Sequence, residues 1–405
     1  MSVMATTLRA RGGFPLSHAP YYYWVEVLPR SSSFRGWKVK FRSDRDALSE
    51  ALQTVQRGVS SRPGIPALTG VLLDAADSGD LTLTTTDLEV SARLAIEVQV
   101  SEPGRVLVPA RLLADTVKSL SDAPVEFDAD RGQAQIRCAA FEGALRLLSA
   151  EDFPTLQPPA GNRVTVEAAT FAEAVAQVGK AASRDEARPV LTGVLLEISR
   201  EGVTMVATDS YRLAVRDLIA TAQGEAKAIV PERAITEAGR AAAGEEKGGI
   251  ELVVDEAQVS FRIGALTLTS RLIEGEFPNY RQLLPEGYEN RLTISRQQLM
   301  DAVRRVGLLA RDTTPVRLEF NALGVKLSSS SPDVGQALEA VEARYEGEDM
   351  TVAFNPAYLA DGLAVTSGES VRLEVRDGLK PGIVRGESDE FTYLVMPVRL
   401  PAPVA

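Results

Sequence analysis

Histidine and cysteine are nearly absent from this chain of 405 residues, which contains only His18 and Cys138. Acid–base catalysis by histidine, and metal sites built from histidine and cysteine, are therefore excluded from most of the chain. A lone cysteine cannot form a disulfide within the chain, which suits a reducing compartment. We therefore expect a cytoplasmic protein.

Long apolar runs are also missing. No stretch reaches the ~20 residues that a membrane-spanning helix needs, so we expect no membrane partner. A secretory signal is excluded at the start of the chain, where Arg11, Ser17, His18 and Pro20 interrupt the apolar residues. With 45% hydrophobic and 24% charged residues, the composition is typical of a globular protein, and the length predicts two to four domains.

Motifs for catalysis are weak. Residues 239–244 have the glycine spacing of a phosphate-binding loop, but two glutamates follow where lysine and serine or threonine are needed. Asp87 and Asp209 each follow a threonine at matching places in two similar segments, a setting that favours turn formation over catalysis. A magnesium site at these carboxylates is the alternative. We expect no catalytic residue, no cofactor and no metal site.

The chain contains three similar segments of more than one hundred residues. Residues 48–55 (LSEALQTV) return as residues 171–178 (FAEAVAQV) and 299–306 (LMDAVRRV), and residues 66–73 (PALTGVLL) return as 189–196 (PVLTGVLL). A repeat of this length is too long for a solenoid and predicts three domains of one design.

We place the three domains at residues 38–157, 163–286 and 291–400, followed by a tail at 401–405. Residues 1–37 have no repeat partner and contain both tryptophans. We interpret them as a flexible extension, or as translation from a start codon placed too far upstream.

Each repeat has the pattern of two helices and about eight strands. Leu48, Ala51, Leu52 and Val55 follow helical spacing, whereas residues 80–87 (DLTLTTTD) alternate as strands do. Residues able to cap or open the helices precede the helical patterns: Asp44, Thr170, Ser295, Pro109, Pro231 and Pro356. The predicted helices are residues 44–59, 109–121, 169–184, 231–243, 295–311 and 356–366. The fold class is therefore α+β, with two helices packed on mostly antiparallel sheets in each of three repeated domains.

Charge is distributed unevenly between these elements. The net charge is −11, which by itself argues against a nucleic-acid partner. The predicted helices are nevertheless close to neutral or basic, and residues 295–311 are the most basic of them. The remaining segments are strongly acidic. The pattern indicates a helical surface that is less acidic than the rest of the molecule.

Several segments resemble the bacterial DNA sliding clamp, the beta subunit of DNA polymerase III. They are residues 208–215 (TDSYRLAV), 276–285 (EFPNYRQLLP), 354–359 (FNPAYL) and 393–400 (YLVMPVRL). The resemblance extends from about residue 38 to residue 400, and the threefold repeat with a near-terminal MPxRL is highly specific. The family begins with Met-Lys-Phe, which VKF matches here, so we expect the native start at Val39.

The resemblance implies a homodimer in which the first domain of one copy joins the third domain of the other. Each copy would supply three domains, which form half of a closed ring. The six domains together would enclose double-stranded DNA without sequence specificity. The helices would line the hole. The cations expected to face DNA are Arg57, Arg62, Arg111, Lys118, Lys180, Arg184, Arg233, Arg240, Arg304 and Arg305. Leu308 and Leu309 are expected in the dimer seam, the alternative being that they are core residues of their own domain.

The resemblance also implies a hydrophobic groove that captures peptide tails of partner proteins. Its expected residues are Arg188, Leu191, Thr208, Ser210, Leu213, Pro278, Leu283, Asn355, Tyr358, Leu379, Met396, Pro397, Val398 and Arg399. Tyr211, Val190 and Gln282 differ from residues common in the family, which leaves the preference among partners open.

The implied function is that of a non-catalytic processivity factor, which tethers the replicative polymerase to DNA. The implied partners are the DNA polymerase III alpha subunit, a clamp loader, and other clamp-motif proteins such as translesion polymerases, mismatch repair proteins and ligase.

Two alternatives stay open. One is a specialised second copy of the clamp with altered inhibitor or partner binding. The other is an α+β enzyme built by duplication.

Overall fold

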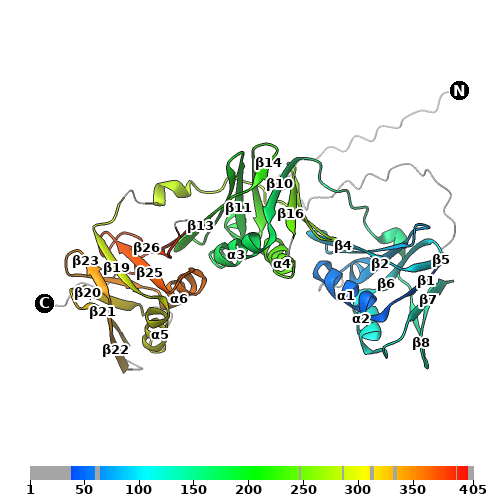
Figure 1. The fold of residues 1–405 in the computed structure, drawn as a ribbon, viewed down its shortest axis with the longest axis horizontal. Coiled ribbons are helices and arrows are strands. Elements are labelled where there is room, and N and C mark those ends of the chain that lie inside the picture. The colour runs from blue at the N-terminus through cyan, green and yellow to red at the C-terminus, as the bar shows by residue number, and fades with distance from the viewer. Residues whose placement is uncertain are drawn as a thin grey trace, which may run out of the picture. The chain divides into compact units, whose positions relative to one another are not determined.

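A computed structural model of the chain describes residues 38–59, 64–245, 248–284, 287–310, 314–331, 335–388 and 390–399. Within these residues the same series of elements occurs three times (Figure 1): one strand, a helix, five strands, a second helix and three strands. The α+β class with antiparallel sheets is confirmed. No helix among the described residues combines the length and the apolar character that a membrane span requires.

The bounds of the elements are as follows. The first repeat contains β1 (Val39–Ser43), α1 (Arg45–Val55), β2 (Gly70–Ala75), β3 (Asp80–Thr86), β4 (Val90–Glu97), β5 (Gln99–Glu102), β6 (Gly104–Pro109), α2 (Ala110–Ser119), β7 (Val125–Asp130), β8 (Gln133–Cys138) and β9 (Phe141–Arg146). The second contains β10 (Asn162–Glu167), α3 (Ala168–Gly179), β11 (Gly193–Ser199), β12 (Gly202–Thr208), β13 (Arg212–Leu218), β14 (Thr221–Ala222), β15 (Ala226–Pro231), α4 (Glu232–Ala242), β16 (Gly249–Val254), β17 (Gln258–Ile263) and β18 (Leu266–Arg271). The third contains β19 (Asn290–Ser295), α5 (Arg296–Gly307), β20 (Val316–Asn321), β21 (Gly324–Ser331), β22 (Gly335–Glu342), β23 (Arg344–Glu346), β24 (Met350–Phe354), α6 (Pro356–Val365), β25 (Ser370–Val375), β26 (Gly382–Arg385) and β27 (Phe391–Val395).

The helices begin where local chemistry allows it. Asp44 and Ser295 cap α1 and α5 as predicted, each accepting a hydrogen bond from a backbone N–H of the first turn. The prediction of Thr170 as a cap is wrong. Glu167 caps α3 instead, because its carboxylate accepts from the N–H groups of Ala169 and Thr170 and a negative charge is favourable at a helix N-terminus. The first helices also end earlier than predicted, since the chain leaves the α-helix at Gln56 and at Lys180.

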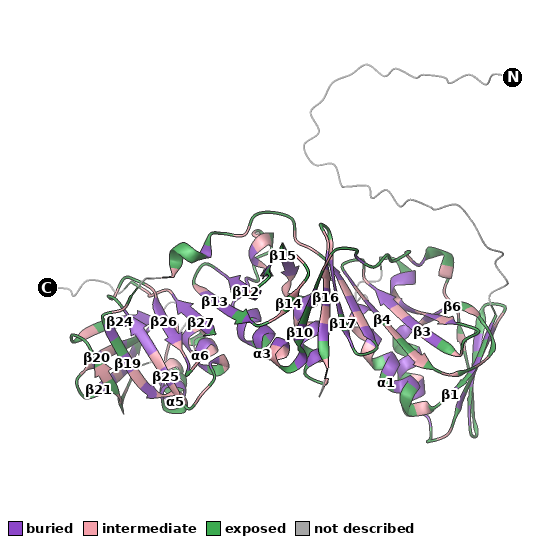
Figure 2. Ribbon diagram, turned by 45° about the horizontal axis from the view of Figure 1, so that its top comes forward, coloured by how far each residue is buried: buried purple, intermediate pink, exposed green. Residues whose placement is uncertain are grey.

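Each repeat folds around its helix pair. Helix α1 packs on α2, α3 on α4 and α5 on α6, and the residues where helices and strands meet are buried (Figure 2). Aromatic pairs fill the first two cores, with Phe41 stacked on Phe127 at 4.9 Å and Phe171 packed on Phe261 at 5.8 Å between ring centroids. The apolar stripe of each helix is therefore buried, and its polar side is left free.

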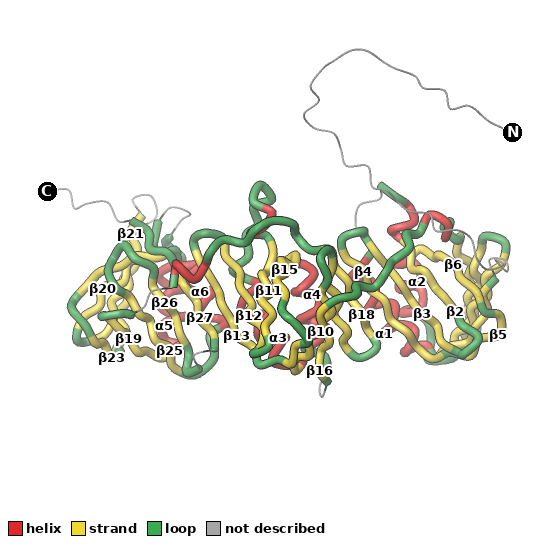
Figure 3. The backbone as a smooth tube through the Cα atoms, turned by 90° about the horizontal axis from the view of Figure 1, so that it is seen from above, coloured by secondary structure: helices red, strands yellow, loops and turns green. Residues whose placement is uncertain are grey.

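The sheets cross from one repeat into the next. In the described chain each repeat has a five-stranded and a four-stranded sheet, and the four-stranded sheet of one repeat pairs with the five-stranded sheet of the next. Strand β4 pairs with β18, and β13 pairs with β27, both antiparallel. Two continuous nine-stranded sheets result (Figure 3). The five-stranded sheet of the first repeat and the four-stranded sheet of the third repeat stay separate. Their edge strands β9, the counterpart of β18 and β27, and β22, the counterpart of β4 and β13, have no neighbour beyond them within the described residues.

Candidate functional sites

A tight turn between β12 and β13 contains the first residues of the predicted peptide site. The carboxylate of Asp209 accepts hydrogen bonds from the N–H groups of Tyr211 and Arg212, both at 2.9 Å, and Ser210 adopts a left-handed backbone with φ of +79°. The prediction that Asp209 forms a turn is confirmed, and Asp87 does the same in the first repeat. The turn leaves the side chain of Tyr211 59% exposed.

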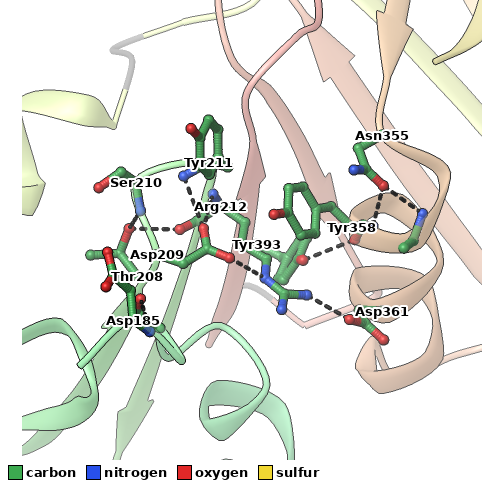
Figure 4. A network of polar contacts seen from close by, with 12 residues as sticks. Asp185, Thr208, Asp209, Ser210, Tyr211, Arg212, Asn355, Tyr358, Asp361 and Tyr393 are labelled. Carbon is green, nitrogen blue, oxygen red and sulfur yellow. Dashed lines mark hydrogen bonds and ion pairs between the residues drawn. The ribbon is translucent and has the colours of Figure 1, made fainter. Parts of the chain in front are cut away.

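Arg212 joins the second repeat to the third (Figure 4). Its Nε donates to Asp209 Oδ2 at 3.0 Å, and its Nη1 donates to Asp361 Oδ2 in α6 at 2.5 Å. The guanidinium lies 4.6 Å from the ring centroid of Tyr358. The Lys180 ammonium approaches the other oxygen of Asp361 at 3.9 Å. A largely buried cation is thus compensated by two carboxylates and a ring face, as desolvated arginines require.

Two tyrosines from different repeats form one aromatic surface beside this network. The rings of Tyr211 and Tyr358 stack with centroids 6.2 Å apart and planes 21° from parallel. Tyr358 is held in place by its own helix, because Asn355 caps α6 and Tyr393 donates its hydroxyl to the Tyr358 carbonyl at 2.9 Å. Figure 4 shows these side chains converging from the turn before β13, from α6 and from β27.

The segment after β27 passes between the two repeats. Met396 N–H donates to the Tyr211 carbonyl at 2.8 Å, and Val398 N–H donates to the Ala353 carbonyl at 2.8 Å. Pro397 forms a β-bridge with Phe354. The backbone of this segment is therefore fixed to the second repeat at one residue and to the third repeat two residues later.

A separate apolar core, called here the junction cluster, lies beneath this segment. Its buried members come from strands of both repeats and from the linker: Leu195, Val206, Leu213, Val215, Ile229, Tyr280, Ile383 and Leu394. Val190, Phe277 and Met396 pack against it and are only partly buried. The predicted site therefore has an apolar base that continues to partly exposed side chains, which suits capture of apolar groups.

The other predicted groove residues differ in exposure. Leu191 and Thr208 are buried, and Arg188 is oriented by Asp185 at 2.9 Å and by Ser210 at 3.0 Å. Pro278, Leu283, Leu379 and Arg399 are exposed and are not members of the junction cluster.

Arg212 and Asp361, whose contacts organise the site, are not among the residues predicted from the sequence. The only signal available was that Arg212 closely follows the turn-forming Asp209 and comes just before the apolar run at residues 213–215.

The cations predicted to face DNA fall into two groups. Five of them form ion pairs: Arg57 and Arg240 with Glu237, Arg233 with Asp87, Arg305 with Glu339 and Lys180 with Asp361. Four others are exposed and form no ion pair with a described residue: Arg111, Lys118, Arg184 and Arg304. Arg62 lies outside the described residues.

The pair predicted for the dimer seam lies just beyond the end of α5. Leu308 is 81% exposed, and Leu309 is half-buried. Neither is a member of the buried core. The alternative that both are core residues of their own domain is therefore not supported by their burial.

The comparisons with known proteins agree with one another. Family models of the N-terminal, central and C-terminal domains of the DNA polymerase III beta subunit match residues 39–157, 165–279 and 281–399. The chain is 37% identical over 375 residues to the beta sliding clamp of Streptomyces coelicolor, covering 89% of this chain and 100% of that protein. It is 32% identical to the beta sliding clamp homolog GriR of Streptomyces muensis, over 89% of this chain and 99% of the relative.

Solved structures give the same result. The sliding clamp of Bacillus subtilis superposes with a TM-score of 0.86 at 29% identity, over 90% of this chain and 100% of that one. The Pseudomonas aeruginosa sliding clamp bound to griselimycin superposes with a TM-score of 0.85 at 31% identity, over 89% and 100% of the two chains. The chain therefore belongs to the family of the DNA polymerase III beta subunit, the bacterial sliding clamp, and is a non-catalytic processivity factor of DNA polymerase.

Proposed function

We propose that two copies of this chain close into a ring of six repeats around duplex DNA. The observation that carries the proposal is the pair of open sheet edges, β9 and β22. At both internal junctions the third strand after the first helix pairs with the last strand of the next repeat, as β4 with β18 and β13 with β27. Strand β22 is the third such strand, and β9 is the last strand of the first repeat. Pairing of β22 with β9 of a second copy repeats the same junction.

The internal junctions also predict the register of that contact. Leu213 lies opposite Leu394, and Ser91 lies opposite Thr269. The equivalent residues at the open edges are Gln336 in β22 and Ala144 in β9, by position in their hairpins. We therefore expect Gln336 of one copy opposite Ala144 of the other. Exposed Leu308 lies beyond the end of α5 in the repeat that supplies β22, where it supports an apolar seam.

The helical surface supports contact with DNA that is weak enough for sliding. Across the internal junctions, Arg57 at the end of the first helix pairs with Glu237 of α4, and Lys180 pairs with Asp361 of α6. These carboxylates reduce the attraction of the paired cations to phosphate. Arg111 and Lys118 on α2, which form no ion pair with a described residue, keep their full attraction to phosphate. Retention on DNA would then come mainly from enclosure, with modest help from counterion release.

The surface around Tyr211, Tyr358 and Met396 is proposed as the peptide groove. Its apolar base, its exposed rims from two repeats and the griselimycin-bound clamp of Pseudomonas aeruginosa support this assignment. The clients proposed are the DNA polymerase III alpha subunit, the clamp loader, translesion polymerases, mismatch repair proteins and ligase. Flexible Met396 suits a site that accepts several different side chains.

Cysteine cross-linking tests the ring. In a Cys138→Ser background, Gln336→Cys with Ala144→Cys forms disulfides between copies, because directly opposed strand residues bring Cβ atoms within disulfide range. Gln336→Cys with Arg146→Cys, two residues along the same strand, is the control and forms far fewer. Double cross-linking should yield a covalent dimer that stays on nicked circular DNA through high salt and escapes after linearisation. An obligate monomer, or equal cross-linking of both pairs, would refute the proposed closure.

Griselimycin binding tests the groove independently. Met396→Ala is expected to weaken binding by about tenfold, since apolar anchors at the centre of a site typically contribute more than 1 kcal/mol. Leu323→Ala, at a leucine of the third repeat that is 84% exposed and lies outside the junction cluster, should leave the affinity unchanged. Absence of binding to the wild-type chain by calorimetry would refute the assignment.

A further inference from the structure

Glu197 is a nearly buried carboxylate that has no assigned part in the processivity function. It lies in β11, in the second repeat, and its side chain is 12% exposed. Tyr280 donates its hydroxyl to Glu197 Oε2 at 2.8 Å, Arg281 Nη2 donates to the same oxygen at 2.5 Å, and Lys227 Nζ lies 2.8 Å from Oε1. Burial acts to raise the pKa of Glu197, but the hydrogen bonds from Arg281, Lys227 and Tyr280 outweigh it and lower the pKa to about 2.

Lys227 lies in the neighbouring strand β15. The other two partners, Tyr280 and Arg281, lie on the linker between the second and third repeats, residues 272–284, called here the strap. Figure 3 shows it running as a loop with a short helical turn across the strands of the second repeat. Ile273 N–H donates to the Ile229 carbonyl at 2.8 Å, and the short helix Tyr280–Leu283 follows. Besides these backbone contacts, the ion-paired cluster at Glu197 is what holds the strap to the sheet through charged side chains.

The strap also forms part of the proposed groove. Its Tyr280 is buried in the junction cluster together with Leu213 of β13 and Leu394 of β27, the strands that join the two repeats. Pro278 and Leu283, two predicted groove residues, lie on either side of Tyr280 along the strap. The position of the Tyr280 ring therefore determines where Pro278 and Leu283 of the strap lie relative to Leu213 and Met396.

The repeats supply an internal comparison. Asp74 and Glu319 occupy the position of Glu197 in the first and third repeats, where they pair with Arg105 and Lys326. In the first repeat Leu156 stands at the place of Tyr280, a glutamine follows it, and Leu156 is exposed. The carboxylate is thus common to all three repeats. The tyrosine and arginine that fasten the strap to it are found at the repeat that carries the proposed groove.

We propose that Glu197 is a positioning residue for ligand capture: by fastening Tyr280 and Arg281 it holds the strap in the conformation that completes the groove. The inference rests on the proposed function, because it concerns the affinity of that same site. Glu197 touches no ligand. Its loss acts through the strap, so it slows or weakens capture without altering the ring.

The test compares Glu197→Gln with two matched controls, Asp74→Asn and Glu319→Gln, all in the full dimeric protein with griselimycin as the probe. Calorimetry or surface plasmon resonance is expected to show about tenfold weaker binding for Glu197→Gln and wild-type binding for both controls. Hydrogen exchange at the Ile273 and Leu284 amides should accelerate in Glu197→Gln, while amides of β12 keep wild-type protection. Retention on nicked circular DNA should be unchanged.

The outcomes separate the two proposals. If the wild-type chain fails to bind griselimycin, the groove itself is refuted, and the role of Glu197 with it. If the wild type binds and Glu197→Gln binds equally well, only the role of Glu197 is refuted. Equal loss in the two control variants, or accelerated exchange throughout the second repeat, would show a general effect on folding and would also overturn the inference. Tyr280→Phe, which keeps the ring and removes the donor, should show an intermediate loss in affinity.

Discussion

The guanidinium of Arg212 donates to the carboxylate of Asp361 at 2.5 Å, although the two residues belong to different repeats and are 149 positions apart. The same guanidinium holds Asp209, which shapes the turn that presents Tyr211. One side chain therefore links the turn between β12 and β13 of the second repeat, helix α6 of the third repeat and the aromatic surface between them.

Replacement of Arg212 by glutamine should lower the free energy of unfolding by about 2–3 kcal/mol, because two carboxylates lose a charged donor at a poorly exposed site. Arg233→Gln is the control. It breaks the pair with Asp87 at the other junction, where the arginine side chain is about half exposed, and should cost below about 1 kcal/mol. Urea denaturation of both variants measures the difference, and equal losses would contradict the special role of Arg212.

Replacement of Gly362 by alanine should destabilise the third repeat by about 1–3 kcal/mol, the usual effect of overpacking. A Cβ on Gly362 would lie 2.4 Å from the ring of Tyr393, inside any acceptable contact distance. Gly179→Ala is the matched change in α3. There the nearest atoms lie at 3.6 Å, so the better helix propensity of alanine should leave the stability unchanged or higher by up to ~1 kcal/mol. Thermal unfolding of both variants tests the contrast, and a stable Gly362→Ala would contradict it.

The stabilisation by Glu197 should depend on pH in an acidic window. The folded-state pKa is lowered from 4.5 to about 2, so the contribution is complete above pH 4.5 and is lost as the pH falls toward 2. The difference in unfolding free energy between the wild type and Glu197→Gln should therefore be constant from pH 8 to 5 and shrink below pH 4.5. Urea denaturation at several pH values gives this difference directly. A difference that grows on acidification would have the wrong sign.

Two pairs of cations at equivalent helix positions should differ in their contact with DNA. Arg111 and Lys118 on α2 are exposed, whereas Arg233 and Arg240 on α4 are ion-paired with Asp87 and Glu237.

The slope of log affinity against log salt concentration, for binding to a short linear duplex, reports the number of phosphate contacts. Arg111→Gln with Lys118→Gln should reduce this slope by the equivalent of up to ~2 contacts, and Arg233→Gln with Arg240→Gln should reduce it by clearly less. Fluorescence anisotropy across a salt series measures both slopes. Equal slopes would show that the ion pairs do not attenuate phosphate binding.

The repeat and the fold class could be predicted from the sequence because both are local properties. The apolar stripe around Leu48 and Val55 and the alternation in residues 80–87 report which side of each element is buried. The resemblance then supplied residues such as Asn355 and Met396. Their local geometry in the structure, a helix cap and a strand-like segment between two repeats, is consistent with a site at this junction.

The contacts between repeats could not be predicted in the same way. Arg57 meets Glu237 across 180 residues, and nothing near either residue indicates the other. Nothing near Glu197 in the sequence indicates its role, because its partners Tyr280 and Arg281 lie more than eighty residues away in a linker that has no periodic pattern. The cap of α3 was misplaced for a related reason, since both Glu167 and Thr170 are chemically able to cap and only the end of β10 decides between them.

The unpaired edges of β9 and β22 give every free copy one edge of the β18 and β27 type and one edge of the β4 and β13 type. Copies that pair through these two edges assemble either into an open fibre or into a closed ring. The twist accumulated over the two junctions within each chain decides between them. Subunit number is then encoded in backbone geometry far from the meeting edges. A substitution inside either nine-stranded sheet that altered its twist would change how many copies assemble, even with both edges intact.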